Sequence, residues 1–112
     1  MSESFIYITC ASPDEAETIG AMLVERRLAA CVNILPGMRS LYWWRGKVER
    51  GEETVLIAKT RDGLVEPLTD AVKAAHGYEV PCVVSLPITG GNPDFLEWIR
   101  TETVGGGEKG SR

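Results

Sequence analysis

Residues that could bind a soft metal ion stand far apart in the sequence, but the expected topology brings them together. Cys10 ends the first predicted strand and Cys82 lies at the start of the fourth, while His76 and Glu79 lie in the connection leading into the fourth. Thiolate and imidazole groups suit copper(I) or zinc. Because these two strand ends should meet at one edge of an antiparallel sheet, the sequence suggests a metal site there. The open alternative is that both cysteines pack as small buried apolar side chains.

The aromatic run Tyr42-Trp43-Trp44 suggests contact with another subunit. Strand residues alternate between the two faces of a sheet, so Trp43 points away from its two neighbours. Both faces of the sheet therefore carry large apolar groups, although the two helices expected at residues 13–28 and 64–75 would cover only one face. Exposed aromatic surface of this kind is typical of an interface. The alternative is one core tryptophan with two partly exposed aromatics at a strand end.

Other candidate residues carry weaker signals. Lys59, at the end of the third strand, could meet an anion or simply lie in solvent. Cys31 follows a helix within an apolar stretch, where we expect core packing. Residues 90–92 precede a helix and could hold an anion at its N-terminus or form a plain capped loop. We can place no Ser-His-Asp arrangement, phosphate loop or His-Glu-x-x-His motif, and a single histidine limits acid–base chemistry, so we expect no enzyme.

The amino-acid composition further limits the kinds of fold and of binding partner that the protein can have. The chain has 112 residues, 44% of them hydrophobic, which fits one folded domain. With 12 basic and 16 acidic residues the net charge is −4, which disfavours nucleic acid as a partner. Residues 54–58 also lack the aromatic side chains with which RNA-recognition sheets stack bases. The apolar run at residues 5–8 is too short for a membrane span or signal peptide, so we expect a cytoplasmic protein with reduced cysteines and no membrane partner.

The elements that must position these residues can be read from hydrophobic spacing and capping signals. Ser12-Pro13 starts a helix, since serine caps it and proline suits the first helical position. We expect four strands. The first covers residues 5–10, the second runs over 31–35 and continues after a bend at Pro36-Gly37 over 39–44, the third covers 54–60 and the fourth 79–86. Helices are expected at 13–28 and 64–75 with a short one after Asn92, and residues 45–53 should form a charged hairpin arm.

This order predicts an α+β domain with the ferredoxin-like βαββαβ plan, an antiparallel sheet in the order 4-1-3-2 and an additional C-terminal helix. Residues 1–104 should form this single domain. Residues 105–112 contain four glycines and no apolar residue, so we expect a disordered tail.

The motifs resemble those of the CutA-type divalent-ion tolerance proteins over about residues 5–104. The matching stretches are Leu28-Ala29-Ala30-Cys31-Val32-Asn33, Ser40 to Lys47, Lys59-Thr60, His76 to Pro81, Gly90-Gly91-Asn92 and Phe95 to Ile99.

This resemblance implies a homotrimer whose sheets pack around a threefold axis, with clefts between subunits like those of trimeric nitrogen-regulatory signalling proteins. It implies tolerance of copper and other divalent ions, with metal at Cys10, His76 and the position of Cys82. For the intersubunit cleft the residues implied are Tyr42, Trp44, Lys59, Tyr78, Glu79, Pro81 and Trp98.

The chain departs from the family pattern at three positions. Gly77 stands where proline is common after the histidine, and Phe95 where tyrosine is common. Cys82 replaces an acidic residue, which exchanges a hard oxygen ligand for a soft sulfur and would favour copper(I).

We therefore expect a trimeric protein that binds copper or another divalent ion and acts in metal tolerance, with no cofactor required for folding. The alternative function is a small-ligand sensor that uses the intersubunit clefts, with Lys59 meeting an anionic group.

Overall fold

The computed structural model describes residues 2–104, so the tail predicted for residues 105–112 lies outside the described residues. The elements follow one another as β1 (Glu3–Cys10), α1 (Pro13–Glu25), β2 (Cys31–Trp44), β3 (Lys47–Arg61), a short 3-10 helix (Asp62–Leu64), α2 (Val65–Ala75), β4 (Val83–Ile88) and α3 (Pro93–Glu102).

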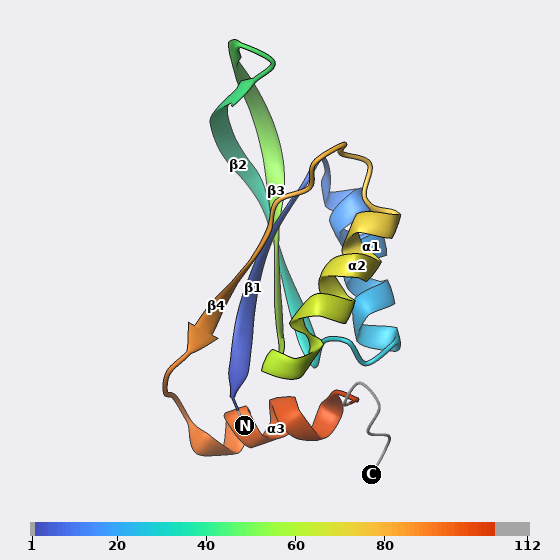
Figure 1. Ribbon diagram of the computed structural model, residues 1–112, viewed down its shortest axis with the longest axis vertical. Coiled ribbons are helices and arrows are strands. Elements are labelled where there is room, and N and C mark those ends of the chain that lie inside the picture. Colours follow the sequence, from blue (N-terminus) through green and yellow to red (C-terminus); the bar gives the residue numbers. More distant parts are fainter. Residues whose placement is uncertain (1, 105–112) are drawn as a thin grey trace.

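The strands form one four-stranded sheet in the order β2-β3-β1-β4, in which every neighbouring pair is antiparallel. This is the order predicted from the sequence. Helices α1 and α2 lie together on one face of the sheet, while α3 runs across the end of the sheet near the N-terminus (Figure 1). The hairpin of β2 and β3 extends well beyond the helices as a separate arm.

The hydrophobic core lies between the sheet and the two long helices. Ile6 and Ile8 of β1 and Leu56 of β3 are fully buried, and Ile6 pairs with Ala58 in register. Ile19 and Leu23 of α1 meet them from the helical side. Because side chains alternate along a strand, the residues between these positions point to the other face of the sheet.

Helix α1 starts where the sequence predicted and ends three residues earlier. The Ser12 hydroxyl accepts a hydrogen bond from the Glu15 amide at 3.1 Å, which caps the helix. At the other end Arg27 adopts a left-handed conformation with φ 58°, and the Leu28 amide donates to the Leu23 carbonyl at 2.9 Å. This is a Schellman ending, which stops the helix at Glu25 instead of Leu28.

The charged arm is regular strand, so the prediction that β3 begins at Thr54 is wrong. Arg45 and Gly46 form the two-residue turn with φ values of 52° and 81°, the signs that a type I′ hairpin turn requires. The ladder continues directly from the pair Trp44 and Lys47. The charged residues of the predicted hairpin arm are therefore strand residues of a two-stranded ribbon, and two of them, Glu49 and Glu53, are half-buried.

Strand β4 begins at Val83 and includes Pro87, which corrects the predicted span of residues 79–86. Proline lacks a backbone N–H and is tolerated in a strand at a sheet edge. β4 is such an edge, since β1 is its only neighbour in the sheet of the described residues. Residues 79–82 consequently lie outside the strand.

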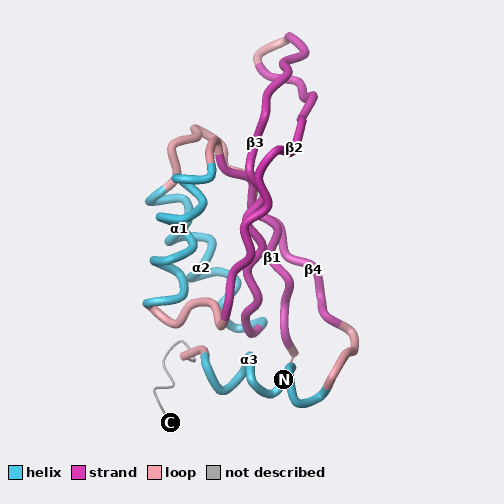
Figure 2. The backbone as a smooth tube through the Cα atoms, turned by 180° about the vertical axis from the view of Figure 1, so that it is seen from behind, coloured by secondary structure: helices cyan, strands magenta, loops and turns pink. Residues whose placement is uncertain are grey.

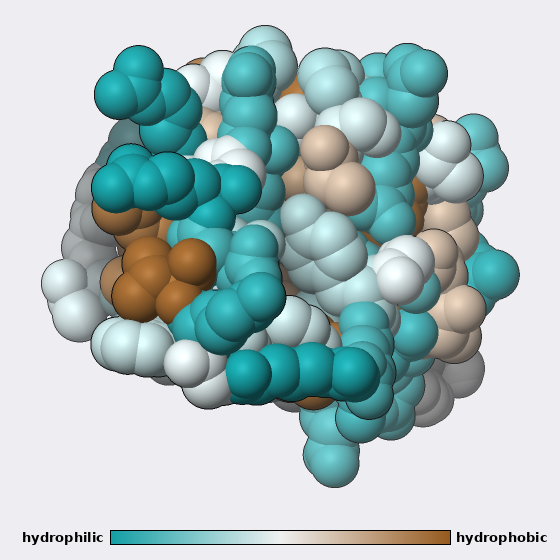
Figure 3. Space-filling model, turned by 90° about the horizontal axis from the view of Figure 1, so that it is seen from above, coloured by the Kyte–Doolittle hydropathy of each residue, from teal (hydrophilic) through white to brown (hydrophobic). Residues whose placement is uncertain are grey.

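Among the described residues, no helix or strand covers the face of the sheet opposite α1 and α2 (Figure 2). Val84 and Leu86 of β4 are 50% and 47% exposed there, beside Tyr7 and Phe5 in register. Seen from the tip of the arm, the surface is mostly hydrophilic with a local hydrophobic patch (Figure 3). Among the described residues, none of the helices is both long and apolar enough to span a bilayer.

Candidate functional site

Cys10, Glu15 and His76 form a cluster at the end of the sheet, which we call the Cys-Glu-His cluster. Cys10 is the last residue of β1, Glu15 lies in the first turn of α1 and His76 directly follows α2. One potential ligand atom from each of them lies within 4.8 Å of the others. Within residues 2–104, no other group of three His, Cys, Asp or Glu residues is this compact.

Both ring nitrogens of His76 already make hydrogen bonds. Nδ1 accepts from the Tyr78 amide at 3.0 Å, so Nε2 carries the proton and donates to the Thr9 carbonyl at 2.7 Å. The side chain is completely buried, with its Nδ1 3.7 Å from Glu15 Oε2. These bonds tie the segment after α2 to the end of β1.

The Glu15 carboxylate bridges two loops. It accepts from the Ala11 amide through Oε1 and from the Gly77 amide through Oε2, both at 2.8 Å. A side chain at position 77 would crowd this carboxylate, because an added Cβ would lie 3.1 Å from Oε2. The glycine found where the family pattern has proline therefore permits this contact, since proline also has no N–H to donate.

The Cys10 thiol is held in its neutral form. Burial, followed by the negative charges of Glu15 and Glu53, raises its pKa from 9.0 to about 12. A thiolate is needed both for nucleophilic attack and for metal ligation. At neutral pH the thiol must therefore lose a proton before it can bind a metal ion.

We expect Cys10 to resist alkylation in the folded protein. A pKa about three units above the ordinary value lowers the thiolate fraction about 1000-fold. Iodoacetamide at pH 8, followed by peptide mass spectrometry, should modify Cys10 at least that much more slowly in native protein than in guanidinium. Similar rates in the two states would contradict the buried, neutral thiol.

The other two cysteines lie on the opposite face of the sheet from Cys10. The β1–β4 ladder ends at the pair Ile8 and Val83, and Cys82 lies in the loop before β4, where it lines a pocket together with Thr9. Thr9 and Cys10 are consecutive in β1, so their side chains point to opposite faces of the sheet. Cys31 is partly exposed, and Lys59 Nζ lies 4.0 Å from its sulfur, so the expectation that Cys31 is core is not met.

Cys82 instead lines a pocket of about 740 Å³ between the arm and the segment before β4, which we call the arm pocket. Its lining comprises Tyr7, Thr9, Met38, Ser40, Leu41, Tyr42, Trp44, Glu53, Gly77, Tyr78, Glu79, Val80 and Cys82. The Tyr78 hydroxyl donates to Glu53 Oε2 at 2.7 Å. Burial and this bond raise the pKa of Tyr78 above its ordinary value.

The structure brings together four of the residues implied for the cleft, namely Tyr42, Trp44, Tyr78 and Glu79. The remaining three are not part of that lining. Lys59 lies on β3 and donates to Asn33 Oδ1 at 2.6 Å, Trp98 stacks on Phe95 of α3, and Pro81 is half-buried in the loop before β4.

Sequence reasoning missed two carboxylates at this end of the sheet. Glu15 was not considered as a ligand, although it stands five residues after Cys10, in the first turn of the helix that Ser12-Pro13 starts. Glu53 was assigned to a solvated arm. It pairs with Met38 in the sheet, and no local sequence signal indicates that pairing across the bulge between Leu35 and Met38.

Together these features define, within residues 2–104, an α+β domain with a four-stranded antiparallel sheet, three α-helices and a partly buried cluster of soft and hard donors at one sheet end. A family model described as CutA1 divalent ion tolerance protein matches residues 4–102. The chain belongs to this family, as its motifs predicted.

Similar proteins are also named as CutA proteins. The divalent-cation tolerance protein CutA of Archaeoglobus fulgidus is 48% identical over 101 residues, covering 90% of this chain and 97% of the relative. The chloroplastic CutA 1 of Oryza sativa is 46% identical over 98 residues, covering 88% of this chain. The chain spans about half the length of that rice protein, 55%.

Solved structures agree with the fold. The crystal structure of CutA1 from Oryza sativa superposes with a TM-score of 0.89 at 44% identity, covering 92% of this chain and 94% of that one. The Thermus thermophilus CutA1 structure gives a TM-score of 0.88 at 46% identity, covering 90% and 98% of the two chains. This chain and the two solved structures therefore share the α+β architecture described above, a four-stranded sheet with three helices.

Proposed function

We propose that this protein binds a divalent metal ion at the Cys-Glu-His cluster and serves divalent cation tolerance. The observation that carries the proposal is the compactness of the cluster, whose ligand atoms lie within 4.8 Å of one another. Thiolate, imidazole and carboxylate are donors that zinc accepts, and copper accepts the first two readily. The proposal keeps Cys10 and His76 from the sequence prediction and replaces Cys82 with Glu15.

The donor set fits such an ion, but binding has to displace existing interactions. The Cys10 thiol must release a proton, because its pKa is about 12. His76 Nδ1 must also give up the hydrogen bond that it accepts from the Tyr78 amide, because the same lone pair would bind the metal ion. We therefore infer that metal uptake is coupled to proton release and to movement of the segment after α2.

Calorimetric titration with zinc and copper(II) between pH 6 and 8 tests this site. If each bound ion displaces one thiol proton, the association constant should rise about tenfold per pH unit after correction for hydroxide and buffer complexes. Cys10→Ser should abolish this pH dependence and weaken binding, whereas Cys31→Ser serves as the matched control on the opposite sheet face. Equal affinity and slope in Cys10→Ser and the native protein would end the assignment.

We propose further that the protein is a homotrimer. The support is the uncovered sheet face, where Val84 and Leu86 stand about half exposed beside aromatic residues of β1. A patch of this kind on a small protein usually meets another subunit. Symmetric copies of the same chain would cover this patch by packing their uncovered faces against one another.

We also propose that the protein acts by binding and not by catalysis, in the cytoplasm, without nucleic acid or membrane partners and with no metal needed for folding. The family description names tolerance of divalent ions and no reaction. The alternative function, a small-ligand sensor that uses the clefts between subunits, is the weaker proposal. It relied on Lys59 as the anion contact, and Lys59 does not line the arm pocket.

A further inference from the structure

Residues 76–79, which follow α2 and which we call the strap, are bonded at one end to the Cys-Glu-His cluster. The Gly77 amide donates to Glu15 Oε2 at 2.8 Å, and the Tyr78 amide donates to His76 Nδ1 at 3.0 Å. Both acceptors belong to the cluster. The start of the strap is therefore positioned by the same side chains that would bind a metal ion.

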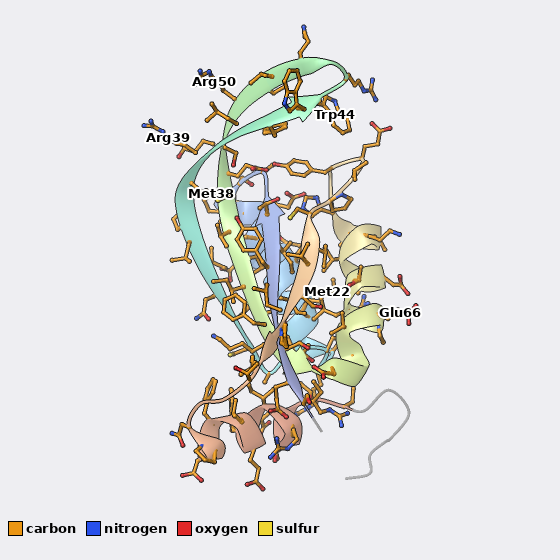
Figure 4. The ribbon with its side chains drawn as sticks, turned by 60° about the vertical axis from the view of Figure 1, so that its left-hand side comes forward. Met22, Met38, Arg39, Trp44, Arg50 and Glu66 are labelled. Carbon is orange, nitrogen blue, oxygen red and sulfur yellow. The ribbon has the colours of Figure 1, made fainter. Side chains whose placement is uncertain are left out.

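The other end of the strap is bonded to the arm. The Tyr78 hydroxyl donates to Glu53 Oε2 at 2.7 Å. Beyond it, Glu79 pairs with Arg45 of the hairpin turn at 2.8 Å, and the Arg45 guanidinium lies 5.3 Å from the centre of the Trp44 ring. The connection after α2 rises toward the arm (Figure 1), and Trp44 lies near the end of the arm (Figure 4). Trp44 can thus report the position of the strap.

Metal binding and the metal-free position of the strap exclude each other. His76 Nε2 carries the proton that bonds to the Thr9 carbonyl, so Nδ1 has the single free lone pair of the ring. That lone pair cannot accept from the Tyr78 amide and bind an ion at the same time. An ion at the cluster must therefore displace the start of the strap, whereas the bond between Tyr78 and Glu53 resists the displacement.

We propose that the strap transmits metal occupancy of the Cys-Glu-His cluster to the arm. This inference rests on the proposed function, because it takes the cluster as the metal site. Coupling between two sites is reciprocal, so the hold of the arm on the strap must weaken metal binding by the same factor by which metal weakens that hold. All the bonds involved lie within one chain, so the coupling needs no open surface on the assembled protein.

Tyr78→Phe tests the coupling from the side of the arm, since it deletes only the hydroxyl that bonds to Glu53. The strap is then easier to displace, and calorimetric titration should show zinc binding about tenfold more tightly than in the native protein. Tyr7→Phe is the matched control. It also deletes one tyrosine hydroxyl, but that hydroxyl donates to Met38 Sδ at 3.2 Å and joins β1 to β2, so zinc affinity should not change.

Fluorine NMR at Trp44 tests the coupling from the side of the cluster. The chain has three tryptophans, and Trp44→Phe identifies the resonance of Trp44 in protein labelled with fluorotryptophan. Zinc should shift this resonance in the native protein at the stoichiometry found by calorimetry, and much less in Tyr78→Phe. Glu15→Gln should shift it in metal-free protein as well, because an amide side chain has one oxygen and cannot accept from both the Ala11 and the Gly77 amides.

Two results would overturn the proposal while leaving the metal site intact. One is zinc binding to the native protein with an unmoved Trp44 resonance. The other is a zinc affinity of Tyr78→Phe equal to that of Tyr7→Phe. Absence of zinc binding to the native protein is a different failure, because it would refute the proposed function and the coupling together.

Discussion

The double variant Val84→Glu/Leu86→Glu should sediment as a single chain, whereas the native protein should sediment at three times 12.2 kDa. Both side chains stand about half exposed on the uncovered face, so two buried carboxylates there would have no counter-charge in an assembled trimer. Burying an unpaired charge costs several kcal/mol, more than enough to dissociate a subunit interface at micromolar concentration. Analytical ultracentrifugation measures the outcome.

Ser85→Glu is the control for this experiment. Ser85 lies between the two substituted residues in β4 but pairs with Ile6, whose side chain points to the helical face. It is itself exposed, so its substitution should leave the assembly intact. A native protein that sediments as a folded single chain, or a double variant that remains trimeric, would refute the proposed interface.

His76→Ala should lower the free energy of unfolding by about 3 kcal/mol even in metal-free protein. The substitution removes a fully buried side chain and leaves the Thr9 carbonyl and the Tyr78 amide without their partners. Urea denaturation in the presence of a chelator, at one fixed protein concentration, measures this effect.

Glu79→Ala provides the comparison, since it breaks only the exposed ion pair with Arg45 and should cost less than about 0.5 kcal/mol. If His76→Ala and Glu79→Ala unfold at the same urea concentration, His76 has no structural role. Its importance would then rest on ligand binding alone.

The parts of the fold that depend on local signals could be predicted from the sequence. Ser12 and Asn92 each stand before a proline and cap the helix that follows, and both accept the expected backbone N–H. The strand order followed from the succession of elements, which matches the ferredoxin-like plan and its usual sheet order. Cys10 and His76 were brought together by that order alone.

The features of the candidate site that depend on strand register and on long-range contacts could not be predicted from the sequence. Cys82 was assigned to the metal site because the start of β4 was expected to lie beside the end of β1, but β4 begins at Val83 and Cys82 lies in the loop before it, where it lines the arm pocket. A shift of one residue moves every side chain of a strand to the opposite face. Glu15 was missed because its bond to the Gly77 amide joins residues 62 positions apart.

X-ray absorption spectroscopy of the zinc-loaded protein tests the central proposal most directly, because it reports which atoms surround the ion. We expect one sulfur ligand together with nitrogen and oxygen, and loss of the sulfur contribution in Cys10→Ser but not in Cys82→Ser. Coordination by oxygen and nitrogen alone, or a sulfur contribution that disappears only in Cys82→Ser, would contradict the Cys-Glu-His cluster as the metal site.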